Sequence, residues 1–298
     1  MAYDFLLSSN TLANGKTAHY ARLAGSAEPK FLIGYRTSYE ENYGLYNTSA
    51  NENNLYYPAD YEAETGFWAY FIYPTARAES KGSFFCLNTY DRARFTFGFM
   101  QYAAHVPNGD FIKFFKSLLI LPNAKEYFPR ISLIDNHIYY NSDHGISSQL
   151  EDDSSTVKFM DYLNPSLSEI ENQELICASR MVHWAINDPA HIKLQVDTAI
   201  DNYKNNLIEY SRRFNLNNAP DKVCQVICDI RHQGRGKNDE IASALNTNGN
   251  WDKAFSNLLL IGYPRFKCRI DTLKSTISDF ISNGVFNKIY DSSQNSFV

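Results

Sequence analysis

The C-terminal part of the chain constrains the fold most strongly, because it follows a helical pattern almost without interruption. From Leu167 onward, apolar residues recur at the 3.6-residue spacing of amphipathic helices. Three proline-containing segments, Asn187–Pro189, Asn217–Pro220 and Tyr263–Pro264, divide this stretch. The pattern predicts helices over residues 168–187, 190–213, 220–232, 239–247, 250–261 and 265–282.

The earlier part of the chain carries weaker and more mixed signals. Residues 1–60 are polar and rich in Asn and Tyr, with one strand-like piece at 31–35, and we treat them as a weakly specified N-terminal region. Residues 66–79 favour a helix that Pro74 kinks or restarts. The remaining expectations are strands at 84–87 and 95–97, a helix at 98–105, a helix at 111–121 capped by Asp110, a hairpin at 131–140 and a polar loop at 149–156.

These elements predict a mainly α (α+β) protein: a helical core with a small β-hairpin beside an active-site cleft. We expect residues 61–298 to form one domain, with an insertion around 125–165. The 298 residues suffice for one large domain or two ordinary ones. The 21 Tyr and 20 Phe are unusually many, and we expect most of them to fill the core. Any that remain exposed suit the flat apolar faces of sugar rings.

Charge and cysteine content narrow the classes of partner. A net charge of -5 and the lack of a basic stripe argue against nucleic acid. Five Cys without paired short spacings are not a disulfide framework, and the scattered His residues indicate no metal site and no cofactor. The first residues do not read as a signal peptide, and no stretch is apolar enough to insert into a membrane. We therefore expect synthesis in the cytoplasm and delivery by other means.

Two carboxylates stand close together in the sequence. Glu79 closes the predicted helix at 66–79, and Asp91 follows where the chain is expected to turn back as a hairpin. Glycoside hydrolysis needs two carboxyl groups, one to protonate the leaving oxygen and one to act on the opposite side of the sugar. The negative end of the helix dipole and three Phe residues near Glu79 in sequence predict a raised pKa, as a general acid requires.

Each of these residues also has an ordinary interpretation. Glu79 is equally consistent with an exposed helix end, and Asp91 with a turn residue at a hairpin tip. Thr96, which follows on the predicted strand, has a hydroxyl that can hold a water molecule, but threonine is common in strands. A catalytic site is favoured because Glu79, Asp91 and Thr96 occur in this order within a short stretch.

The same residues resemble the lysozyme superfamily. Asp91-Arg-Ala-Arg-Phe-Thr96-Phe-Gly-Phe, with Asn108-Gly-Asp110 beyond it, is similar to a motif of bacterial chitosanases, and Gly98-Phe-Met-Gln101 is similar to one of lytic transglycosylases. Residues 226–236, 245–246 and 251–254 resemble phage-type lysozymes, as do Leu260-Ile-Gly-Tyr-Pro-Arg265 and Arg269. The resemblance covers about residues 66–120 and 220–280. It implies a helix–Glu–hairpin–helix core with Glu79 as the catalytic acid.

We therefore predict a glycoside hydrolase of the muramidase type that cleaves the glycan strand of peptidoglycan, as a phage endolysin or a secreted antibacterial effector. The alternatives are a chitosanase-like endoglycosidase and a non-catalytic wall-binding module on the same fold. The predicted partners are this polysaccharide, a delivery machinery and an immunity protein. The predicted catalytic residues are Glu79, Asp91 and Thr96, and the predicted substrate-binding residues are Tyr90, Arg92, Gln101, Tyr102, His105, Arg231 and Gln233.

Overall fold

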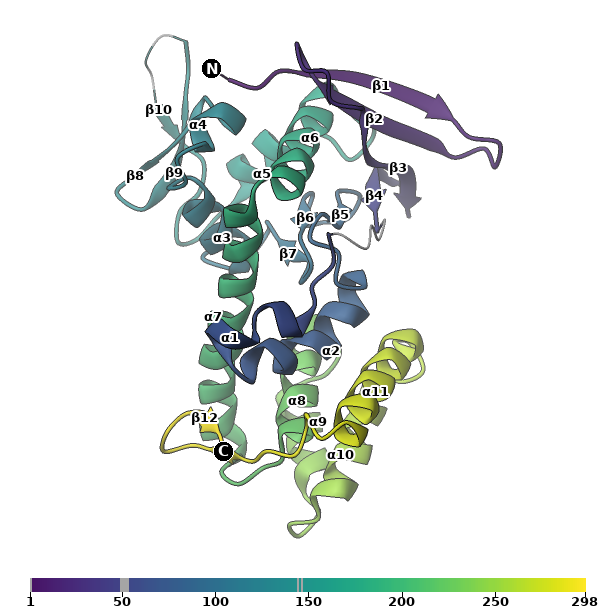
Figure 1. Cartoon of the computed structure of the whole chain (residues 1–298), viewed down its shortest axis with the longest axis vertical. Coiled ribbons are helices and arrows are strands. Elements are labelled where there is room, and N and C mark those ends of the chain that lie inside the picture. Colours follow the sequence, from purple (N-terminus) through teal and green to yellow (C-terminus); the bar gives the residue numbers. More distant parts are fainter. Residues whose placement is uncertain (1, 49–53, 144, 146) are drawn as a thin grey trace. The chain divides into compact units, whose positions relative to one another are not determined.

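The computed structural model describes residues 2–48, 54–143, 145 and 147–298. Helices make up 45% of it and strands 19%, so the expectation of an α+β protein is confirmed at that level (Figure 1). The chain divides into two compact units. Unit 1 comprises residues 1–55 and 83–198, and unit 2 comprises residues 56–82 and 199–298. Both units are therefore discontinuous in sequence, whereas we had divided the chain once, at residue 60.

Unit 1 contains a seven-stranded antiparallel sheet in which every strand pairs with its neighbour in the sequence. Its four long strands are β1 (Phe5–Thr11), β2 (Thr17–Leu23), β3 (Phe31–Tyr39) and β4 (Asn42–Asn47). The three short strands that complete it are β5 (Leu87–Asn88), β6 (Thr96–Phe97) and β7 (Tyr102–Ala103). Such a meander forms from successive hairpins, which need only short connections.

Regular strands in the first 48 residues correct our expectation of a weakly specified region with a single strand-like piece there. Two features concealed them in the sequence. Most of β1 and the end of β3 are exposed, so polar residues occupy positions that a buried strand would fill with apolar ones. A register shift between His19 and Tyr20 then breaks the two-residue period within β2. The strand-like piece expected at 31–35 is confirmed as the first part of β3.

The rest of unit 1 is built from helices and a second sheet. The helices are α3 (Asp110–Leu118), α4 (Ala124–Tyr127), α5 (Val157–Leu163), α6 (Asn172–Asn187) and the first part of α7 (Pro189–Phe214). The second sheet has the order β10 (Ser147–Gln149), β9 (His137–Asn141), β8 (Ile131–Ile134), which confirms the hairpin expected at 131–140. The helix α3 begins at Asp110 after an N-cap at Gly109, so Asp110 is not the cap we predicted.

The segment 98–105 is not the helix that we predicted. Residues 98–101 form a turn between β6 and β7, and both Gly98 (φ +88°) and Gln101 (φ +54°) are left-handed there. The Gln195 side chain on α7 fixes this turn, because its Oε1 accepts a hydrogen bond from Phe99 N at 3.1 Å. Its Nε2 donates to Phe84 O at 2.8 Å. The conformation is therefore set by a residue almost a hundred positions away.

Unit 2 is mainly helical. The helix α7 (Pro189–Phe214) contributes residues 189–198 to unit 1 and residues 199–214 to unit 2. The main helices are α2 (Trp68–Ser80), the second part of α7, α8 (Asp221–Gln233), α9 (Asn238–Leu245), α10 (Trp251–Leu260) and α11 (Lys267–Ser282). Three short elements, namely η2 (Pro58–Asp60), α1 (Glu62–Thr65) and the β11 (Tyr290–Asp291)–β12 (Ser296–Phe297) hairpin, complete it. The six helices predicted beyond residue 167 all form, with ends within one turn of the prediction.

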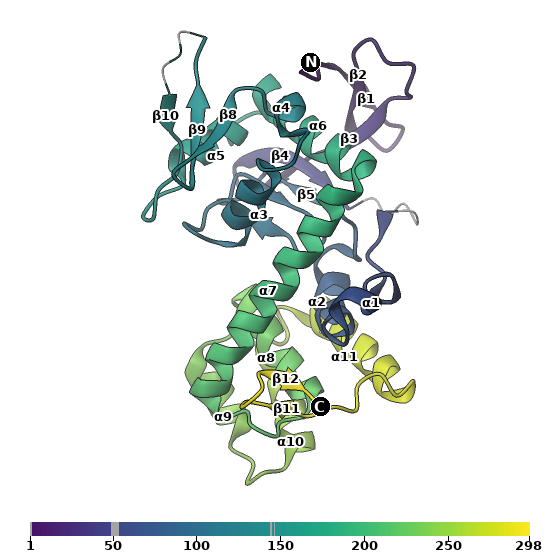
Figure 2. The same ribbon diagram turned by 60° about the vertical axis from the view of Figure 1, so that its left-hand side comes forward.

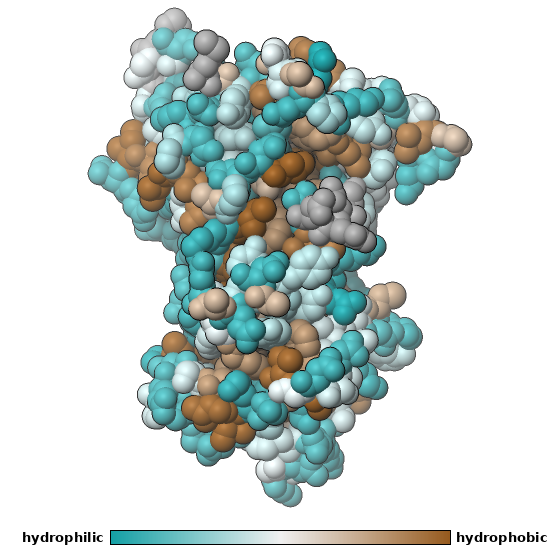
Figure 3. All heavy atoms as spheres, in the orientation of Figure 1, coloured by the Kyte–Doolittle hydropathy of each residue, from teal (hydrophilic) through white to brown (hydrophobic). Residues whose placement is uncertain are grey.

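Aromatic side chains dominate the interior of both units. The largest fully buried side chains include Trp184, Phe111 and Phe115 in unit 1 and Tyr56 and Phe71 in unit 2. Twelve of the 20 Phe residues but only five of the 21 Tyr residues are buried, so our expectation that most of them fill the core is confirmed for Phe and wrong for Tyr. Figure 3 shows hydrophilic residues over most of the viewed face, with hydrophobic ones in small separate groups. None of the helices in the described ranges combines the length and apolar character needed to cross a bilayer.

Candidate functional site

Glu79 lies in the last turn of α2, as its sequence pattern predicted. The helix ends because Lys81 adopts a left-handed conformation (φ +59°) and Gly82 follows with φ +85°. Pro74 lies inside the helix. Since residues four apart share a helix face, Thr75 and Glu79 point the same way.

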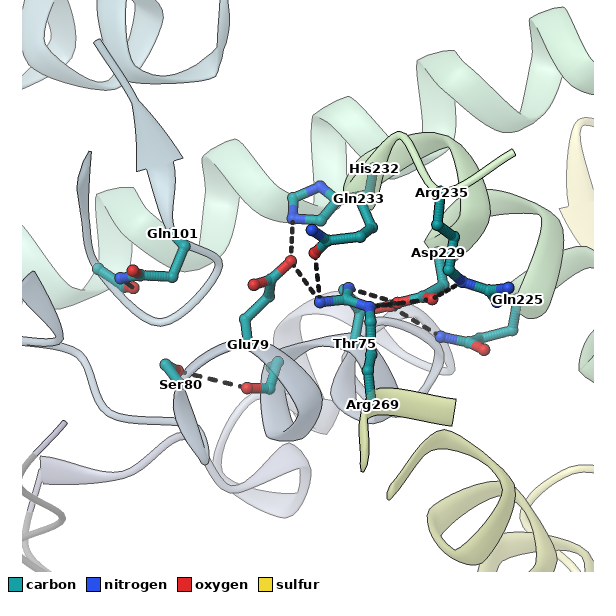
Figure 4. A network of polar contacts seen from close by, with 12 residues as sticks. Thr75, Glu79, Ser80, Gln101, Gln225, Asp229, His232, Gln233, Arg235 and Arg269 are labelled. Carbon is teal, nitrogen blue, oxygen red and sulfur yellow. Dashed lines mark hydrogen bonds and ion pairs between the residues drawn. The ribbon is translucent and has the colours of Figure 1, made fainter. Parts of the chain in front are cut away.

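The Glu79 carboxylate is held by two basic side chains of unit 2. Its Oε1 lies 2.7 Å from Arg269 Nη1 and 3.3 Å from His232 Nε2. Arg269 stands in the first turn of α11, and His232 in the last turn of α8. Figure 4 shows Arg269 between Glu79 and Asp229, with His232 on the other side of the carboxylate.

Arg269 is also bound to Asp229, which is fully buried. Its Nη2 lies 2.6 Å from Asp229 Oδ1, and its Nε lies 3.2 Å from both oxygens. A second arginine, Arg235, donates from Nε to Asp229 Oδ2 at 3.2 Å, and Thr75 donates to Oδ1 at 3.1 Å. Two acids and two arginines therefore form one charge cluster, whose formal charges cancel when His232 is neutral.

The position of Glu79 in this cluster overturns our expectation of a raised pKa. Burial alone would raise the pKa of Glu79. The charge of Arg269, followed by the hydrogen bond and the charge of His232, outweighs burial and lowers the pKa to about 2. Glu79 is therefore ionised at neutral pH in this structure. The neighbours that decide the sign come from α8 and α11, which we had not considered.

Both basic partners hold Glu79 through the same carboxylate oxygen. Both ion-pair distances are to Oε1, and the side chain keeps 14% of its surface exposed. Arg269 Nη1 also donates to Gln233 Oε1 at 2.7 Å. Arg269 thus keeps Asp229 and Gln233 as acceptors if Glu79 gains a proton.

Helix geometry explains how these residues come together. Gln225, Asp229 and Gln233 follow one another at four-residue intervals on α8, so they share one face. Gln225 donates to the Thr75 hydroxyl at 3.0 Å, and Thr75 in turn donates to Asp229. The predicted site residues did not include Asp229, His232, Arg235 and Arg269. The signal for Asp229 and His232 was their polar side chains within a helix of mostly buried residues. Arg235 and Arg269 lie outside α8, and no such local signal marks them.

Two of our predicted substrate-binding residues belong to the same region of unit 2. Gln233 joins the charge cluster through Arg269, so its amide oxygen is engaged. Arg231 is exposed on α8 and makes a long hydrogen bond, 3.4 Å, to Gly236 O. The structure therefore makes Gln233 a partner of the cluster and leaves Arg231 at the surface.

A second group of predicted residues lies in unit 1, around the turn between β5 and β6. Asp91 shapes this turn, since its Oδ1 accepts from Ala93 N at 2.9 Å and its Oδ2 from Asn88 Nδ2 at 3.1 Å. Asp91 is therefore a turn residue, as its ordinary interpretation predicted. Burial and the charge of Arg92 lower the pKa of His105, while Asp91 raises it. Burial raises the pKa of Tyr90, and Asp91 adds to this. Asp91, Tyr90, Arg92 and His105 thus form one electrostatic group.

The other three predicted residues of unit 1 have mainly structural contacts. Thr96 is 6% exposed on β6, next to the β7 strand. Gln101 donates from Nε2 to Cys86 O and Gly98 O, which closes the turn. Tyr102 is 2% exposed, and its hydroxyl donates to Gln195 O at 2.6 Å, so in this structure it is a core side chain.

No group of three or more His, Cys, Asp or Glu side chains suited to a metal ion occurs within the described ranges. Comparisons with protein-family models, with curated proteins and with solved structures give no significant match.

Proposed function

We propose that the protein is a lysozyme-like glycoside hydrolase that cleaves the glycan strand of peptidoglycan, with Glu79 as its catalytic carboxyl. The fold part of the proposal assigns α2 and α8–α11 to the helical core. The observation that carries it is the arrangement of Glu79, which ends a helix, stays partly exposed and is oriented through a single oxygen. The sequence resemblance around Glu79, Asp91 and Arg269 supplies the reaction type.

A proton donor must gain a proton before it can give one, and the resting carboxylate is ionised. A glycan that covers Glu79 displaces water from it, and further burial raises the pKa of a carboxyl. On protonation Arg269 retains Asp229 and Gln233 as acceptors, and it then shares the charge of Asp229 with Arg235. We propose that Glu79 takes up its proton as the substrate binds and then donates it to the glycosidic oxygen.

A second candidate function is a wall-binding module without catalytic activity. The observation that favours it is the ion pair itself, because a buried acid held at a pKa of about 2 is also what a purely structural salt bridge looks like. This candidate predicts binding to peptidoglycan without release of new sugar ends. Delivery to the wall by a lysis or secretion machinery is part of either proposal.

The first experiment compares wild-type protein with Glu79→Gln on purified peptidoglycan and on chitosan. We expect the variant to lose on the order of 10²–10⁴-fold in the rate of releasing new sugar ends from peptidoglycan, the usual contribution of a general acid. Mass spectrometry of the products separates hydrolysis, which leaves reducing ends, from transglycosylation, which leaves anhydro ends.

Glu209→Gln is the matched control, because Glu209 forms only an exposed pair with Arg213 in the same unit. A Glu79→Gln protein that keeps the wild-type rate would sink the catalytic proposal. A wild-type protein that sediments with peptidoglycan but releases no sugar ends would establish the binding module instead.

A further inference from the structure

Unit 1 contains a pocket of about 530 Å³ that none of the sequence motifs involves. Its walls come from Arg130 before β8, Tyr140 on β9, the α5 residues Lys158 and Tyr162, and Arg180 on α6. The strands β8–β10 lie beside α5 (Figure 2). A volume of this size accommodates a ligand of a few residues, since ligand pockets of proteins commonly measure roughly 300–1,000 Å³.

The pocket carries an excess of positive charge. Arg130, Lys158 and Arg180 line it, and Asp161 is the acidic residue of the lining. Asp161 is already paired with Arg94, which does not line the pocket, and Arg130 is paired with Asp143 at the surface. Lys158 and Arg180 form no ion pair with any acidic side chain that the structure describes. These two cations are therefore the ones available to an anionic ligand.

Arg180 has a specific need for an acceptor. Its Nε is buried and has no hydrogen-bond partner among the described residues. Its guanidinium lies 5.6 Å from the centre of the Phe128 ring. Burial raises the pKa of the Tyr162 hydroxyl, and the charge of Arg180 opposes this rise. A buried donor without an acceptor is unfavourable, and a carboxylate oxygen satisfies an arginine donor particularly well.

The remaining walls suit the aliphatic parts of a peptide. The Tyr140 and Tyr162 rings lie 5.9 Å apart, and Leu150 and Ile176 complete an apolar side. A ligand that combines a carboxylate with short alkyl groups matches both features. A polycation such as chitosan does not, because Lys158, Arg180 and Arg130 would repel it.

We propose that this pocket binds a carboxylate of the peptide that is attached to the glycan strand of peptidoglycan. This inference rests on the proposed function, and it names the part of the substrate that separates peptidoglycan from chitosan. The pocket then adds affinity for the wall.

The test measures binding of a free wall peptide by calorimetry. The probe is the tetrapeptide L-Ala-γ-D-Glu-L-Lys-D-Ala, with its carboxyl groups either free or amidated, and the protein is the full chain carrying Glu79→Gln, so that no cleavage interferes. We expect the peptide with free carboxyl groups to bind, and the amidated peptide to bind at least about ten-fold more weakly. Added salt should lower the affinity for the peptide with free carboxyl groups.

Lys158→Gln and Arg180→Gln should each reduce the affinity for the free acid by about ten-fold, and Lys193→Gln, on α7 and outside the pocket lining, should not. Lys158 is exposed, so its variant tests the site even if the loss of Arg180 disturbs folding. Absence of binding, or equal affinity of the Lys158→Gln protein, would overturn the inference. If peptide binding follows this pattern while wild-type protein cleaves no glycan, the proposed function fails and the peptide site stands.

Discussion

Glu79 shows how strongly neighbours determine the behaviour of a single carboxyl. A helix C-terminus and burial both favour its neutral form, yet Arg269 and His232 keep the pKa of Glu79 at about 2. Arg269 is the larger of the two opposing influences. The charge of Glu79 is thus controlled from helices that are distant in sequence.

Replacing Arg269 should therefore reverse the shift in the pKa of Glu79. In Arg269→Gln the burial of Glu79 remains while the main opposing charge is gone, so we expect the pKa of Glu79 to rise above its ordinary value of 4.5. NMR titration of the Glu79 side chain measures this. A pKa that stays near 2 in the variant would show that His232, and not Arg269, holds the carboxylate.

The ion pair of Glu79 with Arg269 also predicts how the free energy of unfolding depends on pH. The folded state lowers the pKa of Glu79, so its ion pair contributes stability above pH 4.5 that is lost as the pH falls toward 2. The loss should be on the order of 3 kcal/mol in the free energy of unfolding. Glu79→Gln should flatten this part of the pH profile in urea unfolding, whereas Glu209→Gln should leave it unchanged.

The pKa of Glu174, in unit 1, is shifted in the opposite direction to that of Glu79. Burial raises its pKa to about 8, even though Thr89 donates a hydrogen bond to its Oε1 at 2.5 Å. Its Oε2 is buried without a partner in the described structure. Between pH 4.5 and 8 the unfolded chain releases this proton while the folded chain keeps it, so stability falls as the pH rises.

Glu174→Gln should remove that loss, because the amide has the same shape and no charge. We expect the variant to be more stable than wild type at pH 8, by up to a few kcal/mol, and similar at pH 4. Thermal unfolding across this pH range checks the prediction. Glu209→Gln, which removes an exposed carboxylate of unit 2, is the control, and a Glu174→Gln protein with the wild-type slope would contradict the prediction.

At the scale of elements, the turn at residues 98–101 depends on packing from α7. Gly98 is left-handed, and a Cβ placed there would overlap the Gln195 side chain. Gln195 is fully buried and holds the backbone at both Phe84 and Phe99. The turn connects β6 to β7, so it also sets where Thr96 lies on its strand.

Gly98→Ala should therefore destabilise the protein by about 2–4 kcal/mol, since backbone strain and overlap with Gln195 add. Gly25→Ala is the matched control, because Gly25 has a similar φ of +74° but nothing within 4 Å of the added Cβ. We expect about 1 kcal/mol for the control. Urea unfolding measures both values, and equal losses would show that Gln195 does not constrain the turn.

At the scale of the whole molecule, each of the two compact units combines two segments that are separated in the sequence. Residues 56–82, which include α2, belong with the C-terminal helices, and residues 83–198 return to the sheet begun by β1–β4. Each unit has its own aromatic core. Sequence patterns within short segments cannot predict such a division, because the contacts that define it join residues far apart in sequence.

The sequence by itself determined the features that depend on local spacing. The helices beyond residue 167 follow from 3.6-residue periodicity and the prolines between them, and the same reasoning placed Glu79 at a helix end. It failed at residues 98–105, where Gln195 decides the conformation, and in the N-terminal strands, where exposed polar residues and a shifted register hide the period.

Only the tertiary structure decided the chemistry around Glu79. Arg269, Asp229 and His232 reach it, directly or through one another, by the packing of α2, α8 and α11, and no local pattern specifies which polar residues of those helices will meet. The physical reason is that a pKa depends on the charges and the burial around a group in space. The sequence therefore located the carboxyl, and packing determined its charge.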